Sequence, residues 1–211
     1  MYWQDRYRAS LGGLNYATSV KPAAEPVSDA EILAHLHLTE NSELAEAQLV
    51  MKAARMAVEA YSGRRIIKQT IRQFYDAWPV GAPLAMALGP VWSSTGTVVS
   101  YGLKGAGYTE EVSSTAWWCT HTQDPAAIIL KTGQQWPTVE MRSAAPIRLT
   151  YEVGYSTSST GAPAWAKMAT LLTGAHWFAN REAVVTGTIA SEVPFSAKSL
   201  MQMHRSPMAQ V

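Results

Sequence analysis

The residues that most often carry catalysis are few in this sequence and widely spaced. The single cysteine, Cys119, lies two positions before His121 in the segment TAWWCTH, where a thiol and an imidazole could form a nucleophile and its base. Residues two apart on a strand share a face, but no helix start or basic cluster lies beside them to lower the thiol pKa. We expect a buried structural cysteine, and a hydrolase that uses Cys119 and His121 stays as an alternative.

The histidines and glycines form no recognisable metal or phosphate motif. His35 and His37 are two apart on a predicted helix, so they point to different faces and cannot share one ion as an i, i+4 pair could. The segment YGLKGAGY is expected to be a hairpin turn, because no helix follows it to hold a phosphate. No Gly-x-Ser-x-Gly elbow and no recognisable carboxylate pair occur. The sequence therefore predicts no enzyme activity, no cofactor and no metal.

Composition narrows the function further. The chain has 211 residues, of which 47% are apolar, enough for a sizeable core. Its formal net charge of +1 gives the whole protein no general attraction to nucleic acid or anionic membranes. One cysteine and the lack of a long apolar run fit a soluble protein of a reducing compartment. Eight tryptophans suggest a surface for partner proteins.

Apolar spacing predicts helices toward both ends of the chain. Ser28 and Glu31 have the spacing of a capping box before a helix at 29–37. A long helix follows over SELAEAQLVMKAARMAVEAYS and ends at Gly63. Pro163 opens a second long helix, AWAKMATLLTGAHWFANREA, and PFSAKSLMQMHR forms the last, short one.

The middle of the chain has the pattern of short strands. β-branched and aromatic runs separated by Gly and Pro predict antiparallel pairing. We therefore expect an α+β fold: a helical body of two long helices plus short N- and C-terminal helices, with an inserted antiparallel β-sheet or small β-barrel. The expected parts are an extended N-terminal arm at 1–27, the helical body at 28–65 and 163–205, the β insertion at 66–160 and a C-terminal tail at 206–211. The expected strands are IKQTIRQFYDAW, LAMAL, GTVVSYG, YTEEV, TAWWCTH, AIILK and PIRLTYEVGY.

The polar segment GAHWFANRE, near the end of the second long helix, is interpreted as helix packing rather than catalysis. Trp177 and Arg181 are i, i+4 neighbours suited to a cation–π contact, worth about 0.5–1 kcal/mol when exposed. His176 and Asn180 form the adjacent pair, and Glu182 ends the helix.

Basic residues cluster once, at Arg64, Arg65, Lys68 and Arg72. The favoured interpretation is a solvated surface or a set of partners for the acidic first half of the chain. A DNA-channel or inter-subunit contact in an assembled ring is the second interpretation. It ranks second because specific nucleic-acid binding requires a broader basic surface or a reading motif.

Three segments together resemble a known family. They are PVSDAEILAHLHL leading into SELAEAQLVMKAARMAVEAYSGRRI, APIRLTYEVGY followed by PAWAKMATLLTGAHWFANRE, and VPFSAKSLMQMHR. They include a Tyr-x-Gly-Arg-like turn and a Trp-x-x-Asn-Arg-Glu-like run. The sequence is similar to the head–tail connector (adaptor, or head-completion) family of long-tailed bacteriophages and gene transfer agents, and it departs from that family in its aromatic N-terminal arm and Trp-rich sheet. The family-like structural residues are Tyr61, Gly63, Arg64, Trp177, Asn180, Arg181 and Glu182.

The resemblance implies a structural virion protein without enzyme activity. Such a protein forms a ring under the portal, extends the DNA channel used in genome packaging and DNA ejection, and provides the docking platform for the next neck or tail-completion protein. It would assemble in the host cytoplasm and lie in the virion neck, between head and tail.

The resemblance also implies partners and a binding segment. The partners would be the portal protein, neighbouring copies in a ring expected to be twelve-fold like the portal, and double-stranded DNA that passes without sequence-specific binding, but no membrane. In such rings the C-terminal helix and tail engage the portal. The portal-binding residues implied here are Leu200, Met201, Met203, His204, Arg205 and Met208.

An alternative function uses the tryptophans of the sheet. If Trp92, Trp117, Trp118 and Trp136 lay on one face, they would form a stacking platform for a carbohydrate or another ligand. The sequence does not show which faces these rings share.

Overall fold

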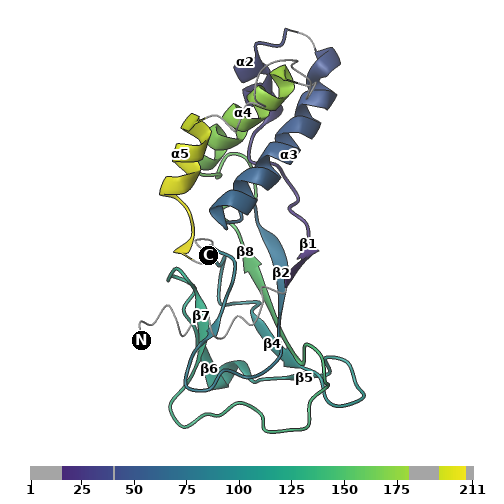
Figure 1. Ribbon diagram of the computed structural model, residues 1–211, viewed down its shortest axis with the longest axis vertical. Coiled ribbons are helices and arrows are strands. Elements are labelled where there is room, and N and C mark those ends of the chain that lie inside the picture. Colours follow the sequence, from purple (N-terminus) through teal and green to yellow (C-terminus); the bar gives the residue numbers. More distant parts are fainter. Residues whose placement is uncertain (1–15, 40, 181–194, 208–211) are drawn as a thin grey trace, which may run out of the picture. The chain divides into compact units, whose positions relative to one another are not determined.

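The computed structural model describes residues 16–39, 41–180 and 195–207, and the chain divides into two compact units (Figure 1). Within the described residues, the helical unit contains residues 22–67 and 155–207, and the sheet unit contains residues 16–21 and 68–154. The chain thus enters the helical unit twice, before and after the sheet.

The helical unit has four helices in its described part. They are α2 (Asp29–Leu36), α3 (Leu44–Ser62), α4 (Ala164–Ala179) and α5 (Phe195–Met203), with a short 3-10 helix, η1 (Asn41–Glu43), before α3. The expected capping box opens α2: the Ser28 N–H donates to the Glu31 carboxylate at 2.8 Å, and the Glu31 N–H donates to the Ser28 hydroxyl at 3.4 Å. Each contact satisfies a donor that the first turn of a helix leaves free.

Helices α3 and α4 pack closely because a glycine faces α3. A Cβ built at Gly174 of α4 would overlap the Sδ atom of Met51 on α3. Buried alanines, including Ala47, Ala54 and Ala169, share this unit's core. These small residues let the two backbones approach, while a salt bridge of 2.7 Å between Lys167 and Glu31 links α4 to α2.

The sheet unit contains two antiparallel sheets. The larger has the order β1 (Tyr16–Val20), β2 (Gln69–Tyr75), β8 (Ile147–Val153), β4 (Val98–Tyr101) and β5 (Glu110–Glu111). The smaller has the order β3 (Leu84–Ala85), β7 (Ala127–Leu130) and β6 (Trp117–Cys119), and the 3-10 helix η2 (Ser114–Ala116) precedes β6.

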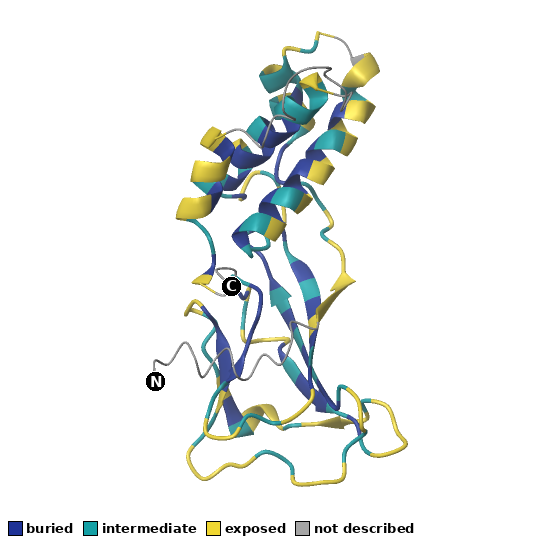
Figure 2. Ribbon diagram, in the orientation of Figure 1, coloured by how far each residue is buried: buried dark blue, intermediate teal, exposed yellow. Residues whose placement is uncertain are grey.

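Alternation along the central strands builds the core of this unit. Every second residue of β8 is buried, beginning at Ile147 and ending at Val153 (Figure 2). These residues share one hydrophobic cluster with Leu84 and Ile128 of the smaller sheet. The two sheets are therefore held together by their apolar inner faces, as period-2 alternation predicts.

Polar side chains inside this core are satisfied by one another. The Tyr151 hydroxyl donates to Gln73 Oε1 at 2.9 Å and accepts from the Leu88 N–H at 3.3 Å. Gln73 also accepts from the Ala87 N–H at 2.9 Å and donates to the Ala85 carbonyl at 3.2 Å. Since buried polar groups are costly when unpaired, this network fixes how the segment around β3 lies on β2.

The expected α+β class is confirmed, and each of the seven expected strand segments contains a strand. Three boundaries differ, one of them at the C-terminal end of the expected β insertion, whose residues 155–160 belong to the helical unit. Tyr16–Val20 of the expected arm forms β1, which pairs with β2 but has all five residues exposed, so no apolar alternation reveals it in the sequence. Ile66 and Ile67 lie in the helical unit, where the Ile66 carbonyl accepts from the Tyr155 N–H at 2.9 Å.

The helix expected at 164–183 ends at Ala179, and the predicted cation–π contact of Trp177 with Arg181 lies outside the described residues. In the part of the chain that is described, no helix is both long and apolar enough to span a membrane.

Candidate assembly surface

Cys119 and His121 lack the features of a nucleophile and its base. Burial raises the pKa of the Cys119 thiol, despite hydrogen bonds with the His121 backbone and the Thr97 side chain that act to lower it. A raised pKa leaves less of the reactive thiolate at neutral pH. Over the described ranges, no three His, Cys, Asp or Glu side chains lie together in a group that could hold a metal ion.

The four tryptophans of the alternative ligand platform lie in different surroundings. Trp117 is buried in the core, whereas its neighbour Trp118 is exposed and has the Lys131 Nζ 4.2 Å from its ring centroid. Trp136 stacks on Trp78, with ring centroids 4.6 Å apart, in a groove of about 700 Å³. Trp92 instead lies beside Lys68. The rings therefore do not form the single platform that the alternative requires.

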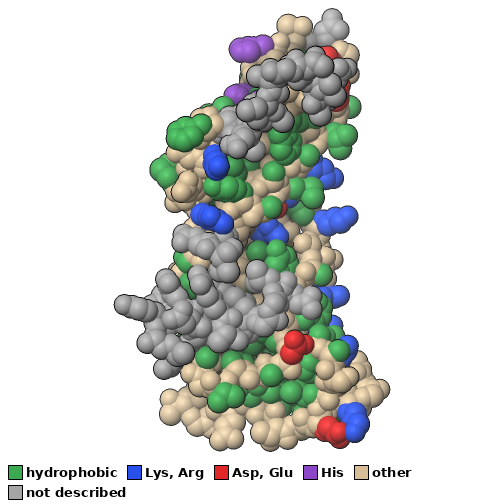
Figure 3. Space-filling view, viewed as in Figure 1, with side chains coloured by type: hydrophobic (Ala, Val, Ile, Leu, Met, Phe, Trp, Pro, Cys, Tyr) green, Lys and Arg blue, Asp and Glu red, His purple; other side chains and the backbone are tan. Residues whose placement is uncertain are grey.

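The basic cluster is divided between the two units. Arg64 and Arg65 belong to the helical unit, and Lys68 and Arg72 belong to the sheet unit. Lys68 is paired with Glu152 at 3.0 Å, within the sheet unit rather than with the acidic first half of the chain. On the described part of the face in Figure 3, basic side chains are scattered and do not merge into one patch. Of the four, only Arg72 is exposed.

Arg64 instead anchors the C-terminal segment. Its Nε donates to the backbone carbonyl of His204 at 2.5 Å, just beyond the end of α5. The Ser206 N–H donates to the carbonyl of Ser62, the last residue of α3, at 2.7 Å. Two polar contacts thus fasten the chain after α5 to the C-terminal end of α3.

Aromatic contacts strengthen the same junction. The Arg205 guanidinium lies over the Tyr61 ring, 5.4 Å from its centroid. The His204 ring stacks on Trp165 of α4, with centroids 4.7 Å apart and planes 11° apart. The helices α3, α4 and α5 therefore meet at one aromatic and cationic junction, formed by Tyr61, Arg64, Trp165, His204 and Arg205.

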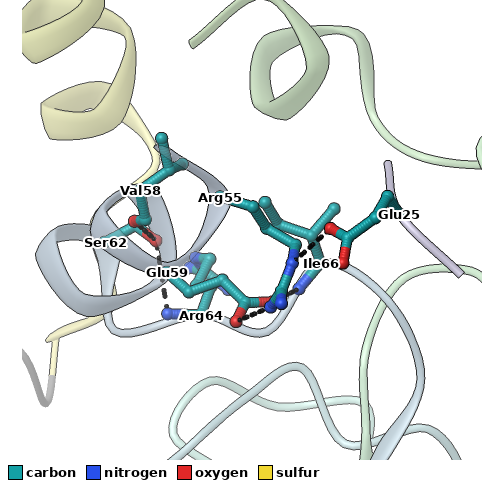
Figure 4. A network of polar contacts seen from close by, with 7 residues as sticks. All are labelled: Glu25, Arg55, Val58, Glu59, Ser62, Arg64 and Ile66. Atoms are coloured by element: carbon teal, nitrogen blue, oxygen red, sulfur yellow. Dashed lines mark hydrogen bonds and ion pairs between the residues drawn. The ribbon is translucent and has the colours of Figure 1, made fainter. Parts of the chain in front are cut away.

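The turn after α3 holds Arg64 in place. Gly63 takes the left-handed conformation, with φ of 67°, and its N–H donates to the Glu59 carbonyl at 3.0 Å. The Glu59 carboxylate accepts from the Ile66 N–H at 2.8 Å and from Arg55 at 2.8 Å, and Arg55 also bonds Glu25 at 2.6 Å (Figure 4). The Tyr-x-Gly-Arg-like turn thus has a structural basis: glycine allows the turn and Glu59 secures its exit.

The sequence-predicted portal set does not form one exposed surface. Met201 is only 3% exposed and packs in the core of the helical unit, so the structure excludes it from that surface. Leu200 is partly buried beside it, whereas Met203 is 71% exposed. Phe195, which the sequence interpretation missed, is 87% exposed at the start of α5. Met208 lies outside the described residues.

Asn180 ends α4 by capping it. Its side-chain amide donates to the His176 carbonyl at 2.8 Å, and its backbone N–H donates to the same carbonyl at 3.1 Å. Trp177 is partly buried on the same helix. Arg181 and Glu182 lie outside the described residues.

No protein-family model matches the sequence, and no curated protein matches it. Several solved structures match the fold of this chain. A chain in the virion of a native gene transfer agent particle is 18% identical, with a TM-score of 0.71 over 90% of this chain and 95% of that one. A chain in the neck of an empty particle, computed with C6 symmetry, is 21% identical, with a TM-score of 0.69 over 92% and 95%.

A chain in the neck of a native gene transfer agent particle, computed with C12 symmetry, is also 21% identical, with a TM-score of 0.65 over 92% of this chain and 95% of that one. The agreement covers nearly the whole of both chains, so it includes the helical and the sheet units. This chain therefore has the fold of chains that occur in the virion and neck of gene transfer agent particles.

Proposed function

We propose that this protein is a structural component of a particle neck: a head–tail connector that forms a ring under the portal. The observation that carries the proposal is the fold shared over 90–92% of the chain with chains of gene transfer agent particles, two of them from necks. In this role the ring extends the DNA channel and gives the next neck or tail-completion protein a surface to dock on.

The ring itself requires two complementary surfaces on each copy and no reacting group. One neighbouring fold comes from a neck computed with C12 symmetry, which supports twelve copies in the ring. The formal net charge of +1 suits a channel wall, because each additional phosphate contact would retard moving DNA. The contact of Arg64 fits such a wall as well, because its Nε donates to the His204 carbonyl of the same chain rather than to a DNA phosphate.

The end of α5 is the proposed portal-docking surface. Met203 is 71% exposed, and the residue after it is held by Arg64 and Trp165. Such anchoring presents a flexible apolar side chain from a fixed base, so less conformational entropy is lost on binding. Phe195, at the other end of α5, is a second exposed apolar contact.

Binding to portal rings tests this role. The purified protein should co-sediment with portal rings, and Met203→Asp should weaken that binding roughly tenfold, because a charge replaces an apolar contact. Met168→Asp is the matched control, since Met168 is also an exposed methionine on a helix of the same unit. Equal binding by both variants and the unchanged chain would place the portal contact elsewhere; no binding by any of them would oppose the connector role.

A further inference from the structure

Two arginines of the sheet unit share one aromatic ring. The guanidinium carbon of Arg148, on β8, lies 4.4 Å from the centroid of the Tyr108 ring, and that of Arg142 lies 5.0 Å from it. The Tyr108 hydroxyl donates to the backbone carbonyl of Ala145 at 2.6 Å, which holds the ring against the segment that carries both arginines. All three side chains are partly exposed. We call Tyr108, Arg142 and Arg148 the arginine–tyrosine cluster.

Backbone contacts fix the position of Arg142. Its N–H donates to the Gly102 carbonyl at 3.0 Å, and the Gly102 N–H donates to the Pro146 carbonyl at 2.9 Å. A Cβ built at Gly102 would lie 2.7 Å from the Arg142 Cδ, so the glycine leaves room for this side chain. The Arg142 Nε also donates to the Ala144 carbonyl at 2.8 Å. The cation is therefore held in place before any partner binds, which lowers the entropy lost on binding.

Neither arginine of the cluster forms an ion pair with a carboxylate in the described part of the chain. The Arg148 Nη2 lies 3.5 Å from the Ser100 hydroxyl, and the Arg148 Nε is buried with no hydrogen-bond partner among the described residues. The two guanidinium carbons are no farther apart than their two distances to the ring laid end to end. That separation is within the roughly 10 Å over which charges interact at 0.1 M salt, so the arginines repel each other and an anion bound to both would offset the repulsion.

Acidic residues beside the cluster decide which anion fits. The Asp76 carboxylate accepts from the Ala145 N–H at 3.3 Å, one contact away from Tyr108. Glu111 of β5 pairs in register with Ser100, which Arg148 contacts. These carboxylates would repel a DNA backbone, which carries a charge at every phosphate, whereas a protein segment can place one acidic side chain on the arginines alone. The surroundings therefore favour a carboxylate of a protein over DNA.

We propose that the arginine–tyrosine cluster is a carboxylate-binding site for an acidic segment of a partner protein. A planar guanidinium can donate two parallel hydrogen bonds to a carboxylate, and arginine and tyrosine are common among the residues that dominate protein interfaces. In the proposed neck, this partner is the next neck or tail-completion protein. The partner's identity thus rests on the proposed function, whereas the chemistry of the site does not.

Titration of the isotope-labelled full-length chain with hexaglutamate tests the site by nuclear magnetic resonance. We expect a saturable shift of the Nε–H signals of Arg142 and Arg148, and no shift with hexaglutamine at the same ionic strength. Arg142→Gln should weaken hexaglutamate binding roughly fivefold, because one of two charged donors is lost. Lys131→Gln is the matched control: it also removes a cation that lies over an aromatic ring of the sheet unit, and it should leave the affinity unchanged.

The site and the neck role can fail separately. If hexaglutamate leaves both arginine signals unmoved while electron microscopy shows rings on the portal, the site is wrong and the neck role stands. If the peptide binds at the arginines but no rings form, the proposed function fails and the carboxylate site stands. The same signals shifted by a short DNA duplex at a lower concentration than hexaglutamate, or by concentrating the chain alone, would assign the surface to DNA or to a second copy and overturn the proposal.

Discussion

The Nε of Arg64 donates a hydrogen bond to the backbone carbonyl of His204, 140 residues later in the chain, at 2.5 Å. Arg64 lies in the turn that leaves α3, and His204 is the first residue after α5. The C-terminal segment is thus held by the turn near the end of the first of the two segments that form the helical unit. This contact leads to the first prediction.

Arg64→Ala should release the segment after α5. The loss of a charge-assisted hydrogen bond is expected to lower the free energy of unfolding by about 1.5–3 kcal/mol. Limited proteolysis should then cut faster near residues 204–207. Arg72→Ala is the control: its side chain is exposed, and the change should stay within about 0.5 kcal/mol. Equal protease resistance in both variants would contradict the anchoring role.

Arg55→Met should be among the most damaging single changes in the helical unit. The side chains of Arg55 and Glu59 are each only 6% exposed, and the substitution removes the Arg55 cation from the buried Glu59 carboxylate. We expect a loss of about 3–5 kcal/mol in chemical denaturation. Lys104→Met breaks an ion pair whose partners are more than 70% exposed, so it should cost under about 1 kcal/mol. Similar losses of stability for Arg55→Met and Lys104→Met would contradict the role of Arg55 as the buried counter-charge of Glu59.

Glu31 should make the stability of the helical unit depend on pH. The Lys167 ammonium and the Ser28 N–H lower the pKa of this carboxyl below its ordinary value of 4.5. A lowered folded-state pKa stabilises the protein above the ordinary value, and the stabilisation is lost as the pH falls through the folded-state value. The free energy of unfolding of Glu31→Gln should therefore differ from that of the unchanged chain at pH 7, and the two values should converge in acid.

Denaturation at several pH values checks this convergence. The control is Glu140→Gln, because Glu140 forms an exposed pair with Lys104, and its loss should change the free energy of unfolding by less than about 1 kcal/mol. If the difference in the free energy of unfolding between Glu31→Gln and the unchanged chain grew as the pH fell, the stabilising role of the Glu31 carboxylate would be contradicted.

The effect of Gly174→Ala on stability should change sign with the residue at position 51. Alanine is better than glycine in a helix by about 0.8–1 kcal/mol, but the new methyl would overlap Met51, so we expect a net loss. In a Met51→Ala background the overlap is removed, and the same substitution should stabilise. Thermal denaturation of the four variants measures this coupling, and additive effects would argue against close packing of α3 and α4.

Cys119 should react slowly with thiol reagents. Burial raises the pKa of its thiol, so the thiolate fraction at pH 7 is lower than in an unfolded chain. We expect maleimide labelling at least about tenfold slower in the native than in the denatured protein. Cys119→Ser should leave portal binding unchanged. Rapid native labelling, or loss of binding in the variant, would revive a chemical role for this residue.

Local signals in the sequence were sufficient for most of the fold. The capping box at Ser28, the glycine after α3 and the proline before α4 act over a few residues, so a single sequence reveals them. β1 could not be found this way. Its five residues are all exposed, and only pairing with β2, about fifty positions later, makes it a strand.

The candidate site was harder to predict because its parts are distant in sequence. Met201 and Met203 are two apart on one helix, and the sequence left portal binding and packing on the helical core open for both, whereas in the structure only Met201 packs in the core. The basic residues Arg64 and Lys68 looked like one cluster, whereas the boundary between the two units separates them. The division of the methionines follows from helical spacing once the buried face of α5 is known, whereas the division of the basic residues follows from which segments pack together.

Electron microscopy of portal rings incubated with the purified protein tests the central claim most directly. The account predicts an added ring of density beneath each portal, with the portal's own symmetry and with the end of α5 at the contact. Portal rings that look the same with and without the protein, at concentrations that saturate other neck contacts, would contradict it.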